Sequence, residues 1–204
     1  MRRVTCLVVA LLLPLVAAAQ GRDSVSYSYF HVGYADAEIY SLDGSGYDLE
    51  ASVSAGEHFY LFASFGSAEL DDTSGAELSE KVIGFGVHFD VSDNVSLYTA
   101  LGYTEIELDT IIGSAVDDGR YLRGGVRFKP TDQLELRAGV ERADFDELLG
   151  EDTAIVLGVD VFATDAVSFA LNYREYDDLS FLTLAARFHF GGTSRSPRRP
   201  PSRR

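Results

Sequence analysis

The stretch that decides the fold is residues 181–190, with the sequence FLTLAARFHF. Alternate side chains of a β-strand point to opposite faces, so an extended chain would give this stretch two different faces. One face is wholly apolar and consists of Leu182, Leu184, Ala186, Phe188 and Phe190. The other face is more polar and consists of Thr183, Ala185, Arg187 and His189. Such a strand fits a soluble sandwich with an apolar core, or a membrane barrel with its apolar face against lipid.

The same alternation recurs upstream and predicts ten strands, with no helical period after residue 19. Upstream strands are expected at 25–39, 47–55, 59–70, a fourth ending near Phe89, 95–108, 121–129, 134–145, around 155–161 and 167–173. A bulge near Tyr29 and Phe30 is expected to switch the faces of the first strand. Residues 42–46 are expected to form a turn, and residues 111–119 a longer loop.

Connection lengths and strand-end aromatics favour a membrane barrel. Short turns are expected after strands two, four, six and eight, and longer loops after strands one, three, five and seven, as in transmembrane barrels. Aromatic side chains near the short turns are Phe59, Phe89, Phe128, Phe162, Phe188 and Phe190. Those near the loops are Tyr34, Tyr47, Tyr103, Tyr121 and Tyr173. Two such belts suit two membrane interfaces.

The sequence therefore predicts an all-β fold, an antiparallel up-and-down transmembrane β-barrel of ten strands, with eight strands as the alternative. An even number of strands leaves both ends of the chain on the periplasmic side. A soluble all-β domain, in which the strand-end aromatics are accidental, is the alternative to the membrane reading.

Residues 1–19 have the features of a secretory signal peptide, with Arg2 and Arg3 before an apolar run and small residues before Gln20. The expected domain organisation is a signal peptide at 1–19, a barrel at 20–190 and a disordered basic tail at 191–204. Cys6, the one cysteine, lies in the signal peptide, so the mature chain would have no disulfide. The tail is expected to be an unstructured extension, or an arm that touches anionic lipid headgroups or the cell wall.

Charge excludes one class of partner. The chain has 17 Lys and Arg and 32 Asp and Glu, a net charge of −15. Seven of the basic residues lie in the leader and the tail, so residues 20–190 hold ten against all 32 acids, a net of −22. Nucleic acid is not an expected partner, because binding it needs a basic surface.

The opening Val25-Ser26-Tyr27-Ser28-Tyr29, the repeated hairpins and the aromatic-ended last strand carry a family resemblance over roughly residues 24–190. On these features the chain resembles the small single-domain outer-membrane β-barrel proteins of Gram-negative bacteria, in the broad OmpA/OmpX-like class. The resemblance implies a location in the outer membrane, among its lipid and lipopolysaccharide. It also implies an assembly signal read by the barrel-assembly machinery, matched here by Leu182, Leu184, Ala186, Phe188 and Phe190. The tail after Phe190 departs from the family pattern, since family members commonly stop at the aromatic residue.

Charged side chains are expected to face the lumen, where a tight turn at 130–132 would pair Arg127 with Glu135 and set Tyr121 facing Glu141. The predicted lumen network consists of Asp48, Glu50, Arg123, Arg127, Glu135, Arg137, Glu141, Asp160, Arg174 and Arg187. Opposed charges of this kind can line a gated or ion-selective pore. The alternative is a neutralising network that fills a narrow lumen, because small barrels have interiors filled by side chains.

The loop ends are strongly acidic. Clustered oxygen ligands suit divalent cations such as Ca²⁺ or Mg²⁺, and they also attract cationic surface partners. The alternative is a solvated rim that keeps the surface repulsive. The acids are Asp36, Glu38, Asp43, Asp71, Asp72, Glu77, Asp109, Asp117, Asp118, Asp144, Asp146, Glu147, Glu151, Asp152, Glu175, Asp177 and Asp178.

A barrel enzyme would need a histidine beside an acid or a serine at the outer end. His31 and His88 are expected within strands, His58 in a short turn and His189 at the end of the last strand. The sequence therefore predicts no catalytic centre, no bound metal and no cofactor. The expected role is structural or in surface interaction, such as adhesion or membrane integrity. A narrow porin-like channel is the second hypothesis, and a barrel protease or lipid A-modifying enzyme is the third.

Overall fold

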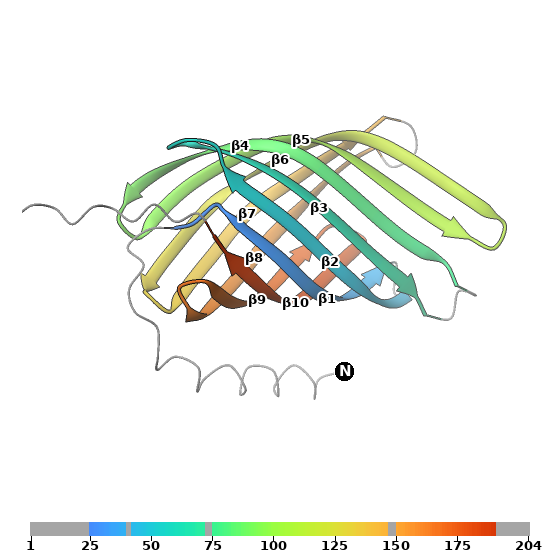
Figure 1. Ribbon diagram of the computed structural model, residues 1–204. Helices are drawn as coiled ribbons and strands as arrows, with labels where there is room; N and C mark the ends of the chain where they lie inside the picture. Colours follow the sequence, from blue (N-terminus) through green and yellow to red (C-terminus); the bar gives the residue numbers. More distant parts are fainter. Residues whose placement is uncertain (1–24, 40–41, 72–74, 147–149, 191–204) are drawn as a thin grey trace, which may run out of the picture.

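Ten antiparallel strands close into one barrel, in which every strand pairs with its neighbours in sequence and β1 pairs with β10 (Figure 1). The computed structural model describes residues 25–39, 42–71, 75–146 and 150–190. The predicted all-β, up-and-down architecture and the count of ten strands are confirmed, and the alternative of eight strands is wrong. The expected signal peptide and tail lie outside the described residues.

The strands differ in length. β5 and β6 form the longest hairpin, whereas β9 has nine residues. The bounds are β1 Tyr29–Ile39, β2 Leu42–Ser54, β3 Phe59–Leu70, β4 Glu77–Ser92, β5 Val95–Thr110, β6 Gly113–Thr131, β7 Leu134–Phe145, β8 Glu151–Thr164, β9 Val167–Glu175 and β10 Leu179–His189. No helix among the described residues is long and apolar enough to cross a bilayer.

Apolar side chains cover the outside of the barrel, and charged, polar and aromatic side chains fill the inside. In β10, Leu182, Leu184 and Phe188 are exposed, while Thr183 and Arg187 are buried in the lumen. This places the two faces of residues 181–190 as the alternation predicted. The expected bulge near Tyr29 is wrong, because β1 pairs with β10 in unbroken register from Tyr29–His189 to Ile39–Leu179.

Two predicted connections are in fact strand. Residues 42–46 belong to β2, and residues 113–119 belong to β6, which leaves only Ile111 and Ile112 between β5 and β6. In β2, Gly44 and Gly46 let the backbone of β3 approach so closely that a Cβ at Gly46 would collide with the carbonyl oxygen of Ser67. The same glycines that suggest a turn thus serve close strand packing. The predicted alternation of short turns and longer loops fails at these two connections.

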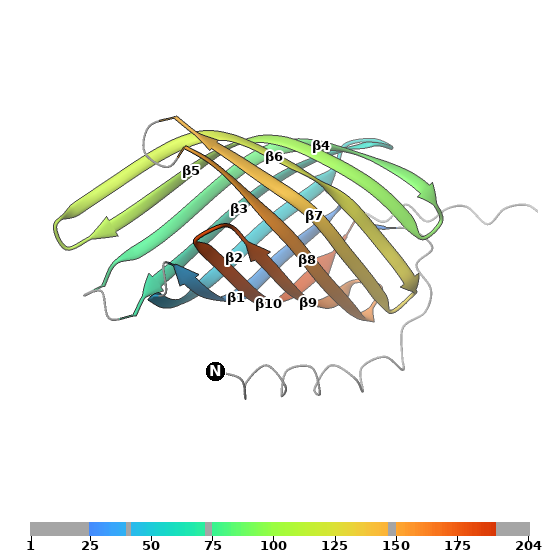
Figure 2. The same ribbon diagram turned by 180° about the vertical axis from the view of Figure 1, so that it is seen from behind.

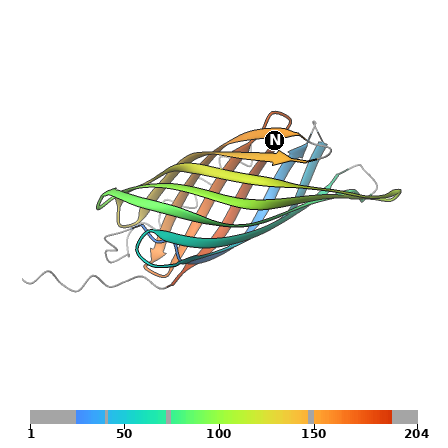
Figure 3. The same cartoon turned by 90° about the horizontal axis from the view of Figure 1, so that it is seen from above.

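The asymmetry between the two ends lies in strand length instead. We call the end that carries the β2–β3, β4–β5, β6–β7 and β8–β9 connections the turn end, and the opposite end the loop end. At the loop end the β5–β6 hairpin extends beyond the other strands (Figure 2). The strands are strongly tilted, as Figure 3 shows from above. Tilt and staggered register are required to close any sheet into a barrel.

Most of the predicted belt aromatics are exposed. Tyr34 and Tyr47 lie on the outside toward the loop end, and Phe59 and Phe89 lie on the outside toward the turn end. Tyr121 and Phe162 do not belong to the predicted belts, because both rings are buried in the lumen. For Tyr121 this agrees with its expected position facing Glu141. Phe162 has the same parity as the inward Asp160 on β8 and pairs with the inward Ser168, so alternation assigns it to the lumen. Tyr121 has the same parity as the inward Arg123 and Arg127, so alternation along β6 assigns it to the lumen.

We predict that Gly46→Ala destabilises the barrel by about 1–3 kcal/mol, because the added methyl group would force the β2 and β3 backbones apart. The measurement is the urea concentration at which the band of the folded, unboiled protein is lost from a gel. Gly66→Ala on the facing strand is the matched control, since its Cβ would meet nothing closer than 3.8 Å. Equal midpoints for the two variants would contradict this packing account.

Candidate functional site

The lumen holds a network of buried ion pairs centred on Asp160 of β8. Arg187 Nη1 donates to both carboxylate oxygens of Asp160, at 2.9 and 3.1 Å. Arg137 Nε donates to the same carboxylate at 2.9 Å, and Arg137 Nη2 donates to Asn172 at 2.6 Å. Asp160 is 0% exposed and Arg187 is 1% exposed. One carboxylate from β8 therefore binds guanidinium groups from two other strands, β7 and β10.

Arg127 and Glu135 form a second buried pair across the β6–β7 hairpin. Arg127 Nε lies 2.7 Å and Arg127 Nη2 lies 2.6 Å from Glu135 Oε1. The backbone register places Arg127 directly opposite Arg137, so the side chain of Arg127 reaches Glu135 diagonally. The structure thus brings together the pair that the sequence placed across this turn.

Two further acids link the network to tyrosines. Tyr121 donates to Glu141, and Arg123 Nε donates to the same carboxylate at 2.8 Å. Glu50 accepts a hydrogen bond from Tyr29 at 2.6 Å and lies 3.6 Å from Arg123 Nη1. Buried carboxylates are stable when charged or polar donors surround them, and these two have both kinds.

Arg174 forms a separate cluster nearer the loop end. Its Nη1 donates to Glu80 at 3.0 Å, and its guanidinium lies 4.7 Å from the centre of the Phe181 ring. A small cavity of about 20 Å³ opens here beside Asp48, Glu80, Arg174 and Phe181, which is room for about one water molecule. Burial raises the pKa of Tyr176, in the β9–β10 connection, above its usual range, so the phenol beside Arg174 stays protonated.

All ten residues of the predicted network therefore face the lumen, but the sequence analysis missed three participants. Glu80 shares the parity of the inward Val82, which is the signal that would have found it. His31, considered only as a catalytic group, lies 2.8 Å from Asp48 and 3.4 Å from Arg187. Tyr29 was obscured by the expected bulge.

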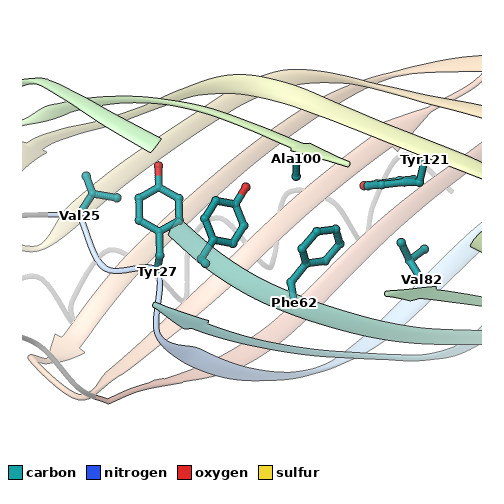
Figure 4. Packing of buried hydrophobic residues seen from close by; sticks show 7 residues of the cluster. Val25, Tyr27, Phe62, Val82, Ala100 and Tyr121 are labelled. Atoms are coloured by element: carbon teal, nitrogen blue, oxygen red, sulfur yellow. The ribbon is translucent and has the colours of Figure 1, made fainter. Parts of the chain in front are cut away.

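An aromatic layer fills the turn end of the lumen. It consists of Tyr27, Tyr60, Phe62, Tyr98 and His88, with Val25, Val82, Ala100 and Tyr121 packed along it. Figure 4 shows Val25 and Tyr27 projecting into the barrel toward Phe62 and Ala100. The lumen therefore contains aromatic side chains at the turn end, charged pairs in the middle and the Arg174 cluster toward the loop end.

The acidic loop ends do not converge on a metal site in the described residues, where no three His, Cys, Asp or Glu side chains are grouped to hold an ion. Asp117, expected at the rim, is buried, and Asp72 and Glu147 lie outside the described residues. On the outer surface, Lys81 lies 2.6 Å from Glu105 and 3.7 Å from Glu107. Arg142 lies 2.5 Å from Glu151.

One serine–histidine pair has the spacing of a nucleophile and its base. Ser168 Oγ lies 2.9 Å from His189 Nε2 and 3.4 Å from Asp160. Ser168 is 0% exposed at the inner wall, so a substrate carbonyl cannot reach it. His88 and His58 contact aromatic rings at the turn end. This arrangement is one of packing and hydrogen bonding, and a catalytic nucleophile needs access to its substrate.

Residues 6–174 match a family model described as the outer membrane protein beta-barrel domain. No match was found among curated proteins.

Solved structures of outer-membrane barrels are similar to the chain at low identity. They include Ail, the attachment invasion locus protein of Yersinia pestis, at 16% identity and a TM-score of 0.42, covering 79% of this chain and 97% of that one. Neisserial surface protein A is 14% identical with a TM-score of 0.43, covering 81% and 98%. The N-terminal barrel domain of Pseudomonas aeruginosa OprF is 14% identical with a TM-score of 0.43, covering 83% and 100%.

We predict that Glu135→Ala lowers the stability of the barrel by about 3–5 kcal/mol, because it leaves the buried Arg127 charge without its partner. The double variant Arg127→Met and Glu135→Met should recover most of this loss, since it removes both charges and keeps the volume. Urea denaturation followed by the folded band on a gel measures both effects. If Glu135→Ala instead left stability unchanged and altered ion conductance, the pair would be a gate rather than packing.

Proposed function

Since this chain belongs to the outer membrane protein beta-barrel domain family, we propose that it serves as an integral outer-membrane protein with a structural or surface-interaction role. The observation that carries this proposal is the filled lumen. Asp160, Arg187, Glu135 and Glu141 are each at most 1% exposed, and aromatic rings occupy the turn end. A lumen filled in this way supports a barrel whose resting state passes few solutes and whose activity lies on its outer surface.

The β5–β6 hairpin supports surface interaction as the role. On β5 its outward side chains beyond Tyr103 are Glu105, Glu107 and Asp109. Lys81 on β4 lies beside the first two acids, which leaves a net negative charge on this side of the hairpin. Tyr103 and Thr110 are seven residues apart, so about 24 Å of β5, measured along the strand, lies beyond Tyr103. Its tip exposes Ile111 and Ile112, at 79% and 94%. An acidic arm with an apolar tip suits cationic surface partners, and divalent cations could bridge it to anionic lipopolysaccharide.

The other hypotheses are weaker on these observations. A narrow channel with a charged lumen is the second candidate, because the inward arginines and carboxylates would give it ion selectivity. A protease or lipid A-modifying site needs an accessible nucleophile or acid–base pair, and the buried Ser168–His189 pair does not offer one. Assembly would proceed through the barrel-assembly machinery acting on β10 and the residue after it. The proposed signal is the outward Leu182, Leu184, Ala186 and Phe188 of β10, followed by Phe190.

We predict that the protein fractionates with the outer membrane, runs at different positions on a gel when boiled and unboiled, and conducts poorly. In planar bilayers its current should be at least about tenfold smaller than that of a 16-stranded porin, because small barrels have side-chain-filled interiors. Sustained currents of porin size would replace the surface role with the channel hypothesis. A soluble protein without a heat-dependent shift would contradict the outer-membrane location.

We predict that the acidic hairpin promotes attachment to a cationic surface. Cells that display Glu105→Gln, Glu107→Gln and Asp109→Asn together should attach about threefold less to polylysine-coated glass at low salt than wild-type cells. The matched control removes three exposed acids at the loop end outside this hairpin, with Asp43→Asn, Asp71→Asn and Asp178→Asn. If the control variant lost as much attachment, net charge rather than the hairpin would be responsible.

A further inference from the structure

Residues 25–28 enter the lumen although they are not part of its wall. Strand pairing on both sides of β1 begins at Tyr29. Even so, Val25, Tyr27 and Ser28 are 9%, 4% and 5% exposed, because the chain bends into the turn end of the barrel (Figure 4). The four residues before β1 therefore fill part of the lumen that the side chains of the strands leave empty.

Tyr27 is the centre of this segment and contacts five strands, one of which is β3, where the ring of Tyr60 lies 4.9 Å away. Its hydroxyl lies 3.0 Å from Ser96 Oγ on β5, and its carbonyl oxygen accepts a hydrogen bond from Ser52 on β2 at 2.8 Å. Its ring lies 4.0 Å from the ring of His88 on β4 and 4.5 Å from the guanidinium of Arg127 on β6. All these wall contacts come from side chains, so Tyr27 can leave without breaking any strand ladder.

The neighbouring wall aromatics lie flat against glycines rather than across the lumen. A Cβ at Gly86 would collide with the ring of Tyr60, and a Cβ at Gly84 would lie 2.8 Å from the ring of Phe62. The hydroxyl of Tyr98 would lie 2.8 Å from a Cβ at Gly125. Because these glycines have no side chain, the rings can lie close to the wall, and Tyr27 fills the space that remains between them.

Ser28 has the bonds expected of a hinge between this segment and β1. Its carbonyl oxygen accepts the backbone N–H of Phe190 at 3.0 Å, and its hydroxyl accepts the backbone N–H of Ser54 at 3.0 Å. These bonds join Ser28 to β10 and β2, the two strands that flank β1. On the other side of Tyr27, the carbonyl oxygen of Ser26 accepts a single hydrogen bond from Arg127 at 2.9 Å.

We infer that residues 25–27 are a removable plug, hinged at Ser28, whose withdrawal lets water and small inorganic ions pass through the lumen. This gives the barrel a gated state beyond the closed resting state proposed above. Withdrawal would also free Arg127 from the ring of Tyr27 and from the carbonyl of Ser26, leaving Glu135 as its bound partner. The plug thus links the mouth of the barrel to the charged layer behind it.

The first test measures ion flux through Tyr27→Ala and Tyr34→Ala in planar bilayers. Tyr34 lies on β1, the strand that follows the plug, but it points outward and is 60% exposed. Its variant therefore controls for the loss of a tyrosine ring. We expect Tyr27→Ala to raise the current about tenfold or more over wild type, and Tyr34→Ala to leave it unchanged. If both folded variants carried the wild-type current, the charged layer alone would close the lumen and the inference would be overturned.

The second test asks whether the plug moves in the native protein. Ser96 and Ser168 are both 0% exposed inward serines, but only Ser96 is hydrogen-bonded to Tyr27. With Cys6 the one natural cysteine, Ser96→Cys or Ser168→Cys gives the mature chain a single thiol to label with a small cationic methanethiosulfonate. We expect slow labelling of residue 96 in otherwise native protein, about tenfold faster labelling in the Tyr27→Ala background, and no such acceleration at residue 168. A fixed plug, which would overturn the inference, would leave residue 96 unlabelled in native protein over times that label the urea-unfolded chain fully.

Discussion

The pairing of β1 with β10 joins the first strand to the last and leaves the sheet without an open edge along Tyr29–Ile39. In lipid no water satisfies a free backbone N–H or C=O group, so a sheet can cross a membrane only when it is closed. The rest of the structure depends on this closure. In contrast to a soluble protein, apolar side chains such as Leu184 and Phe188 lie on the outer surface, and charged side chains such as Arg187 and Asp160 are buried inside.

Closure also creates an interior that must be filled with polar groups in balance. The middle of the lumen matches arginines to carboxylates almost one for one, through pairs such as Arg127–Glu135 and Arg187–Asp160. A buried charge without its partner costs several kcal/mol, so each member of these pairs constrains the choice of the others. The network therefore couples strands that are distant in sequence, as Arg174 on β9 and Glu80 on β4 illustrate.

The two ends of the barrel differ in their side chains and in the length of their strands. At the turn end, tyrosine and phenylalanine rings pack onto inward glycines, and Tyr27 completes the layer from outside the wall. At the loop end, β5 and β6 continue past the apolar belt as an acidic hairpin. The turn end is thus suited to closing and opening the lumen, and the loop end to meeting other surfaces.

The sequence by itself determined the strand periodicity, and with it the barrel class, the outward face of residues 181–190 and the inward charges from Asp48 to Arg187. It also indicated that Arg127 meets Glu135, although the expected register of the hairpin was wrong by two residues and Arg127 lies directly opposite Arg137. Only the tertiary structure decided which residues meet across the lumen and that residues 42–46 and 113–119 are strand. Contacts such as Arg174–Glu80, Arg187–Asp160 and Tyr27–Ser96 join strands far apart in the chain. The physical reason is that alternation fixes which face a side chain is on, whereas its partner across the lumen depends on strand tilt, register and closure of the whole sheet.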